Sequence, residues 1–229
     1  MIRILHLYPE LMNLYGDYGN LTIIANHIKK HGIEVRIDKR EIQDPIIFED
    51  YDFVYMGSGT EKNQLVALND LRKYELYLKE YINDNNVVLF AGNAMELLGN
   101  SIDDELALGI VDFNTRITDK RYTGDVIVYN ETLKETVGFI NKSSLIEGGE
   151  KFKLFDYVFK DNNLSDNSYE GYRYKNLFGT HIIGPVLVKN PYFADEILKL
   201  LLKDQYVDNA DKYEMAAYET TLRELRKRK

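Results

Sequence analysis

Short apolar runs alternate with amphipathic stretches along the first hundred residues, and small or polar residues form the turn after each run. The apolar runs cover residues 2–8, 33–38, 51–56 and 87–90, and the amphipathic stretches cover residues 21–31, 61–83 and 94–98. This repeated order predicts strands that enter helices through tight turns, which is typical of a parallel sheet. We therefore expect an α/β fold, a three-layer sandwich in which helices cover both faces of a mostly parallel sheet.

Loops 15–20, 57–64 and 91–95 follow three of the predicted strands. In open parallel sheets, ligands bind beyond the carboxyl ends of the strands, so these loops are candidate binding segments. Backbone N–H groups in the run Gly57-Ser58-Gly59 can hold a carboxylate or an oxyanion, whereas the alternative is a turn that only needs positive φ. The first loop fits no phosphate-binding spacing, so we expect a tight turn there with Asn20 as helix N-cap.

The second half of the chain has a different pattern. Strand-like segments at residues 108–113, 124–129, 136–141, 154–159 and 176–184 are separated by polar turns. They either extend the sheet or form an antiparallel layer over it. Pro191 is well placed to begin a helix that reaches about residue 203. A last helix over residues 211–228 is charged except for a thin apolar stripe, so it either packs on a neighbour or projects to a partner.

The chain contains no cysteine and carries a formal charge of −8. Disulfides, thiolate metal sites and every cysteine-nucleophile mechanism are therefore excluded. An acidic chain is a poor nucleic-acid binder, and the local basic tail at residues 220–229 is expected to be a solvated helix end. No apolar run reaches the length of a membrane span, and the N-terminus enters a strand directly, so we expect a cytoplasmic protein without a membrane span.

The histidines give little evidence of a metal site. His27 and His31 have the spacing of a metal pair on one helix face, but no carboxylate motif accompanies them, so a solvated face is the favoured interpretation and no metal is expected. His181, at the end of a predicted strand, is the one histidine that we favour for a functional site; otherwise it supports such a site through hydrogen bonds.

Residues 90–99, Phe-Ala-Gly-Asn-Ala-Met-Glu-Leu-Leu-Gly, predict a strand, a sharp turn of small residues and a helix. This is the geometry of a nucleophile elbow, in which the nucleophile stands at the apex of the turn. No Cys, Ser or Thr occupies the apex here. The segment therefore matches the elbow as architecture and lacks its chemistry.

Taken together, these segments resemble the cobyric-acid-synthase-type (CobB/CobQ-like) class I glutamine amidotransferases. The segments that carry the resemblance are residues 8–20, 57–61, 90–99, 137–141, 170–171 and 179–191. Within that family, the chain resembles the glutaminase subunits of lipid II isoglutaminyl synthases. Those subunits act beside a Mur-ligase-like subunit to amidate peptidoglycan precursors. The resemblance implies a flavodoxin-like amidotransferase domain over residues 1–206, a C-terminal helical extension over residues 207–229, and no cofactor.

The chain departs from the family pattern at its two catalytic positions. The family elbow reads Cys-Gly-Gly-Tyr-Gln-Leu-Leu-Gly, and alignment on the final Leu-Leu-Gly places the nucleophile position at Gly92 and the glutamine position at Glu96. The catalytic histidine of the family falls at Ile183, while His181 stands at a tyrosine position. Loss of a nucleophile or its base typically lowers kcat about 10⁶-fold. We therefore expect no glutaminase activity and assign no catalytic residues.

Although the catalytic residues are missing, the resemblance implies a pocket that binds a ligand. Arg121 matches a family arginine that contacts the glutamine, and Gln64 matches the end of the family's oxyanion-loop pattern. The candidate ligand-binding residues are Gly57, Ser58, Gly59, Gln64, Asn93, Glu96, Arg121 and His181. We expect a degenerate, non-catalytic subunit that binds glutamine or a related small polar metabolite, or a partner such as a Mur-ligase-like protein, in a cell-wall setting. The alternatives are an active amidotransferase subunit of lipid II isoglutaminyl synthase or cobyric-acid-synthase type with a non-standard site, and a scaffold whose pocket is closed by Phe90, Met95 and Ile183.

Overall fold

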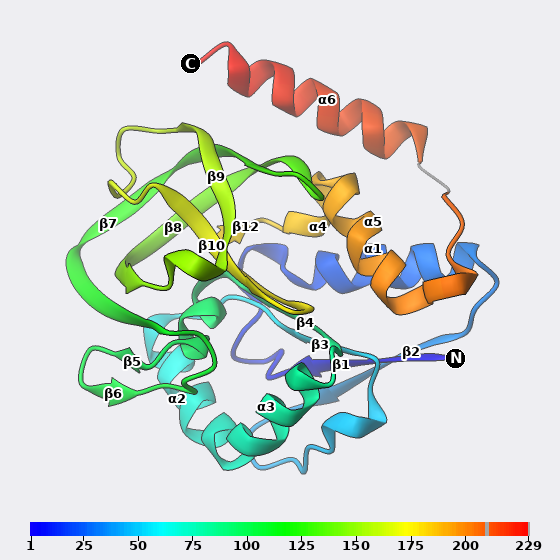
Figure 1. Cartoon of the computed structure of the whole chain (residues 1–229), viewed down its shortest axis with the longest axis horizontal. Coiled ribbons are helices and arrows are strands. Elements are labelled where there is room, and N and C mark those ends of the chain that lie inside the picture. The colour runs from blue at the N-terminus through cyan, green and yellow to red at the C-terminus, as the bar shows by residue number, and fades with distance from the viewer. Residues whose placement is uncertain (209–210, 229) are drawn as a thin grey trace.

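The computed structural model describes residues 1–208 and 211–228 and is built around one mixed sheet (Figure 1). Its parallel half consists, in spatial order, of β2 (Val35–Arg40), β1 (Ile2–Leu7), β3 (Phe53–Met56), β4 (Val87–Ala91) and β11 (Leu177–Thr180). This is the 2-1-3-4-5 order of flavodoxin-like folds, which brings the ends of β1, β3 and β4 together at one edge. The predicted α/β architecture is confirmed.

Helices cover both faces of the parallel half (Figure 1). One face carries α1 (Tyr18–Lys30), α4 (Val186–Lys189) and α5 (Pro191–Leu202), and the other carries α2 (Glu61–Leu71) and α3 (Glu75–Asn83). Alternate residues of each strand enter the two hydrophobic cores: in β4, Leu89 packs with the α1 side, whereas Phe90 packs with the α2 side. The near-continuous apolar strands of the sequence reflect burial on both faces.

The second half extends the same sheet with antiparallel strands, which decides between the two arrangements left open by the sequence. These strands are β7 (Phe113–Asn130), β8 (Lys134–Gly148), β9 (Lys153–Lys160), β10 (Tyr169–Tyr174) and the short β12 (Ile182–Ile183), with a small flap of β5 (Ser101–Ile102) and β6 (Glu105–Leu106). The predicted strand at 108–113 is wrong, because only Phe113 enters β7. The long β7–β8 hairpin was predicted only in its apolar part, since residues 114–123 are rich in polar and charged side chains.

The start of α1 also differs from the expectation. The helix begins at Tyr18, and the N–H of Tyr18 is capped by Asn13 Oδ1 at 2.8 Å. Asn20 is therefore inside the helix and fully buried, where its side chain bonds to the Tyr55 hydroxyl and accepts the N–H of Leu187. The predicted long helix at 61–83 is likewise divided into α2 and α3 by a short turn at Arg72–Tyr74.

The last helix, α6 (Lys212–Arg226), packs back onto the sheet (Figure 1). Its apolar stripe of Tyr218, Leu222 and Leu225 contacts Ile127 and Val137 of the β7–β8 hairpin. Of the two outcomes open to this helix, packing on a neighbour is the one observed. Within residues 1–208 and 211–228, no helix combines the length and apolar character needed to cross a membrane.

Candidate functional site

The turn after β4 has the backbone of a nucleophile elbow. Ala91 is extended, whereas Gly92 has φ +64°, a left-handed conformation that glycine adopts without strain. A Cβ atom placed on Gly92 falls 2.5 Å from both Cβ and Oγ of Ser58, and 3.1 Å from Cγ2 of Ile183. Gly92 and Ile183 are therefore direct neighbours, and Ser58 fills the space in which a side chain on Gly92 would lie.

The loop after β3 has its N–H groups engaged within the chain. The N–H of Ser58 donates to Asp17 Oδ2 at 2.7 Å, and the N–H of Gly59 donates to Asn93 Oδ1 at 2.9 Å. The Ser58 hydroxyl also lies 3.3 Å from Asn93 Oδ1. These two N–H groups, which the sequence offers as an anion site, thus bind carboxylate and amide oxygens of the protein itself.

Asp17 is a member of this site that the sequence analysis did not single out. It is fully buried in the loop after β1. Burial raises the pKa of Asp17 to about 6, although the N–H groups of Ser58 and Gly184 act against that increase. Its signal in the sequence is one acidic residue between the two glycines of loop 15–20. Its role here is to hold the loop after β3 in place.

Glu96 lies beneath the elbow and is 2% exposed. One carboxylate oxygen accepts from Gln64 Nε2 at 2.7 Å, while the other contacts the Ser144 hydroxyl and His181 Nε2, the latter at 3.0 Å. Burial alone would raise the pKa of Glu96, but the interactions with His181, Ser144 and Gln64 outweigh it and lower the pKa. Glu96 is thus a buried carboxylate with its acceptor sites filled, as such a charge requires.

A second buried carboxylate lies behind His181. Glu170 accepts the N–H of His181 at 2.7 Å and the Thr180 hydroxyl at 2.8 Å. Burial raises the pKa of Glu170 to about 7 and lowers the pKa of His181, so His181 is neutral at pH 7 and donates Nε2–H to Glu96. Lys142 is buried near both carboxylates, and burial lowers its pKa as well.

A cavity of about 160 Å³ opens beside these groups. Its wall is formed by Leu14, Tyr15, Ser58, Gly59, Thr60, Glu61, Asn93, Glu96, Ile117, Arg121, Asn141, Lys142, Ser143 and Ser144. Arg121, half exposed, donates to Glu61 at 2.9 Å and to Asn141 at 2.8 Å. The cavity therefore combines two cationic and two acidic side chains within a small volume, which suits a small polar ligand.

The structure places the candidate residues of the sequence in two groups. Ser58, Gly59, Asn93, Glu96 and Arg121 line the cavity. Gln64 and His181 stand behind it and support Glu96, whereas Gly57 packs against Met12 and Asp17.

Sequence reasoning missed Lys142 and Ser144. Their only signal is the strand alternation of β8, in which residues 140, 142 and 144 are buried. None of Phe90, Met95 and Ile183 belongs to the wall of this cavity.

Residues 3–191 match the sequence model of the CobB/CobQ-like glutamine amidotransferase domain. The chain belongs to this family. It is 32% identical over 207 residues to the GatD subunit of lipid II isoglutaminyl synthase (glutamine-hydrolyzing) from Staphylococcus aureus, covering 86% of this chain and 83% of that protein. It is 30% identical over 229 residues to the GatD subunit from Streptococcus pneumoniae, covering 96% of this chain and 87% of that protein.

Solved structures with the same fold include PurLQS from Thermotoga maritima, with a TM-score of 0.58 and 15% identity over 96% of this chain and 99% of that one. A glutamine amidotransferase from the same organism gives a TM-score of 0.54 and 11% identity over 97% of this chain and 91% of that one. At such identities the likeness concerns the fold alone. This amidotransferase-family chain thus keeps the architecture of the fold around an elbow whose apex is glycine.

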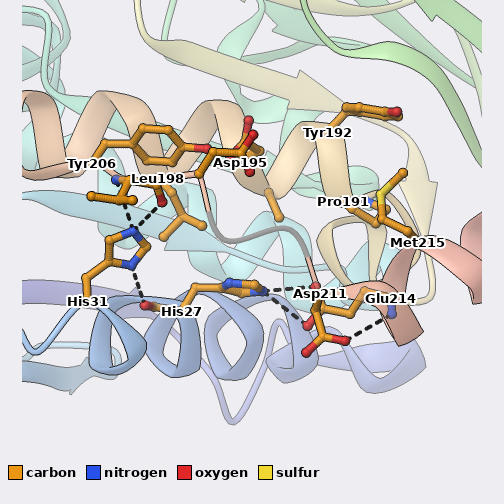
Figure 2. Close-up of a pocket in the computed structure, with 13 residues that line it drawn as sticks. His27, His31, Pro191, Tyr192, Asp195, Leu198, Tyr206, Asp211, Glu214 and Met215 are labelled. Carbon is orange, nitrogen blue, oxygen red and sulfur yellow. Dashed lines mark hydrogen bonds and ion pairs between the residues drawn. The ribbon is translucent and has the colours of Figure 1, made fainter.

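A second cavity, of about 250 Å³, lies away from the elbow between α1, α5 and α6 (Figure 2). His27 is buried here and contacts both carboxylate oxygens of Glu214, at 3.0 and 3.2 Å. His31 contacts the carbonyl of His27 and the backbone of Val207 (Figure 2). The predicted solvated histidine face is wrong, because Glu214 of α6 and the backbone of Val207 contact these histidines. Across the described parts of the chain, no group of three or more metal-ligating side chains is placed to hold a metal ion.

Proposed function

We propose that this chain is a GatD-like subunit that binds a small ligand and a partner but does not hydrolyse glutamine. The observation that carries the proposal is that Gly92 and Ile183, the two positions at which the family pattern has a cysteine and a histidine, lie close together: a Cβ on Gly92 would be 3.1 Å from Ile183. Without a nucleophile and its base, what remains of such a site is typically about 10⁶-fold slower in kcat. The whole chain has no cysteine, so no shift of the alignment supplies the thiol.

The loop after β3 supports the same proposal. Stabilisation of a tetrahedral intermediate needs backbone donors that point at the developing oxyanion. Here the N–H of Gly59 already binds Asn93 Oδ1, at a position where the family pattern has glycine. A substrate oxygen would have to displace this side chain before it reached the donor.

The alternative is glutamine hydrolysis at a non-standard site, and Ser58 is the residue that favours it. Its hydroxyl lies in the space above Gly92, where a nucleophile on the elbow would be. The side chain that contacts this hydroxyl is Asn93, an amide that cannot accept its proton as a base. His181 is bonded to Glu96 instead. We therefore rank this alternative second.

The similarity to GatD proteins supports a proposal for the partner and the cellular process of this chain. GatD proteins are named as subunits of lipid II isoglutaminyl synthase, so we propose a Mur-ligase-like partner, a role in cell-wall precursor amidation and a cytoplasmic location. In such a complex, this subunit would hold the partner or report a metabolite, and the ammonia would come from solution or from another protein.

The test is glutamate release from L-glutamine by the purified protein, with the Ser58→Ala variant measured in parallel. We expect no release above buffer from either protein. Release that follows the wild-type protein through purification and disappears in Ser58→Ala would overturn the proposal and establish Ser58 as the nucleophile. Release that persists in Ser58→Ala would overturn it too and require a nucleophile elsewhere.

A further inference from the structure

Lys142 is a buried lysine of this site. It lies on β8, is 8% exposed, and lines both the 160 Å³ cavity and a much smaller space shared with Glu170 and His181. Within residues 1–208 and 211–228, its ammonium has no hydrogen-bond acceptor and no carboxylate within ion-pair distance. Because Lys142 lines the cavity, an anion bound there can reach its ammonium and offset the cost of partly burying that charge.

The carboxylates around the cavity are already provided with donors. Glu96 is bonded to Gln64, Ser144 and His181, and Glu61 is bonded to Arg121 and Ser143. Their hydrogen bonds are thus already made within the chain. Glu170, near Lys142, likewise accepts from His181 and Thr180, so the ammonium of Lys142 is left available to a ligand in the cavity.

Arg121 supplies a second cation at the open side of the same cavity. Its side chain is 49% exposed, while Lys142 is buried at the inner side. Arg121 uses two of its nitrogen atoms for Glu61 and Asn141, and a guanidinium has five N–H groups, so donors remain for a ligand. A ligand in the cavity thus meets one exposed and one buried cation.

We propose that this cavity binds a small dicarboxylic acid, with one carboxylate on Lys142 and the other on Arg121. The inference rests on the proposed function, since it assigns a bound ligand to a site that does not turn glutamine over. It predicts that L-glutamate binds in preference to L-glutamine. The two molecules are nearly isosteric, but glutamate can place a carboxylate on each of the two cations, whereas glutamine, whose side-chain amide is neutral, can place one on only one of them.

The experiment is calorimetric titration of the full chain with L-glutamate and L-glutamine at pH 7. We expect glutamate to bind about tenfold or more tightly than glutamine. Lys142→Met should remove that preference. The matched control is Lys120→Met, which removes an exposed lysine next to Arg121 and should titrate like the wild type. Thermal unfolding of both variants establishes that they are folded.

Equal affinities for the two amino acids, absence of glutamate binding up to about 10 mM, or a preference that survives in folded Lys142→Met would each overturn the inference. Glutamine turnover, measured on the same protein, tests the proposed function separately. Turnover together with a Lys142-dependent preference for glutamate would overturn the proposed function alone. Absence of turnover together with equal affinities would overturn the dicarboxylate assignment alone.

Discussion

Ser58 fills the space above Gly92, since a Cβ atom on Gly92 would lie 2.5 Å from the Ser58 side chain. Non-bonded carbon atoms do not approach this closely, so the two positions exclude one another as long as Ser58 keeps its side chain. The left-handed φ of Gly92 adds a further cost of about 1–3 kcal/mol for any other residue there. The neighbouring loop therefore excludes a side chain at position 92.

This relationship predicts which variants release glutamate from glutamine. Gly92→Cys with Ile183→His should remain inactive, because Ser58 blocks the new thiol. Adding Ser58→Gly should give glutamate release from glutamine above the wild-type background. The measurement is glutamate release at equal protein concentration, with Ser58→Gly alone as control. Activity in the double variant equal to that of the triple variant would show that Ser58 does not block the elbow.

The hydrogen bond between the Asn93 side chain and the N–H of Gly59 leads to a second prediction for these variants. Adding Asn93→Gly to the triple variant frees the N–H of Gly59. Because one oxyanion donor is typically worth about 10²–10³ in kcat, a rise of about 10²-fold is expected. The check is kcat and KM measured separately for the triple and quadruple variants. A change confined to KM would show that Asn93 only obstructs binding of the substrate.

The parts of the fold that the sequence predicts are those in which the pattern of apolar and small residues is clear. The apolar runs of β1, β3 and β4 are buried on both faces, so their pattern identifies them and their order predicts the sheet. The glycine at position 92 and the small residues around it likewise predict the elbow. The α/β fold and the family were therefore accessible before the structure.

The sequence predicts only part of the buried cluster of Glu96, Lys142, Glu170 and His181. Glu96 and His181 stand out by motif position, but Lys142 and Glu170 reach them from strands that are distant in the sequence. A charged residue in a strand normally predicts a solvated position, and only tertiary packing makes Lys142 a buried one. The same holds for His27, whose burial depends on α6, almost two hundred residues further along the chain.

Glu96 is expected to be a stability determinant. Glu96→Gln places an amide nitrogen against one of the donors Gln64, Ser144 or His181, which leaves a buried donor without an acceptor. We expect a loss of about 2–3 kcal/mol in the free energy of unfolding, measured by urea denaturation at pH 7. Glu147→Gln is the control: this exposed residue pairs with Arg116 at 3.8 Å and should cost less than about 0.5 kcal/mol. Equal losses in the two variants would contradict a special role for Glu96.

Glu170 predicts a pH dependence of stability. Its folded pKa, about 7, lies above the ordinary value of 4.5, so the native state binds more protons than the unfolded state between these pH values. This group is therefore most favourable to folding below about pH 4.5, and its contribution falls as pH rises towards 7. Glu170→Gln cannot ionise and should gain stability relative to the wild type by on the order of 3 kcal/mol between pH 4.5 and 8.

The measurement for Glu170 is the difference in unfolding free energy between variant and wild type across that pH range. The difference matters because His181 acts in the opposite direction: its folded pKa is lowered, so its own contribution grows as pH rises towards its unfolded value of 6.5. A difference that stays constant between pH 4.5 and 8 would show that Glu170 titrates normally.

The docking of α6 gives the last prediction and also tests our proposal that residues 1–206 form a domain with residues 207–229 as an extension. Leu222 is 8% exposed and packs with Ile127 and Val137, so Leu222→Asp would bury a carboxylate among apolar side chains. We expect α6 to undock while the sheet stays folded. In hydrogen exchange, amides of residues 212–226 should lose protection, whereas those of β4 should keep it. Thr220→Asp, on the exposed side of the same helix, is the matched control and should leave both segments protected. Loss of protection in β4 together with α6 would show instead that the helix is part of a single cooperative unit with the sheet.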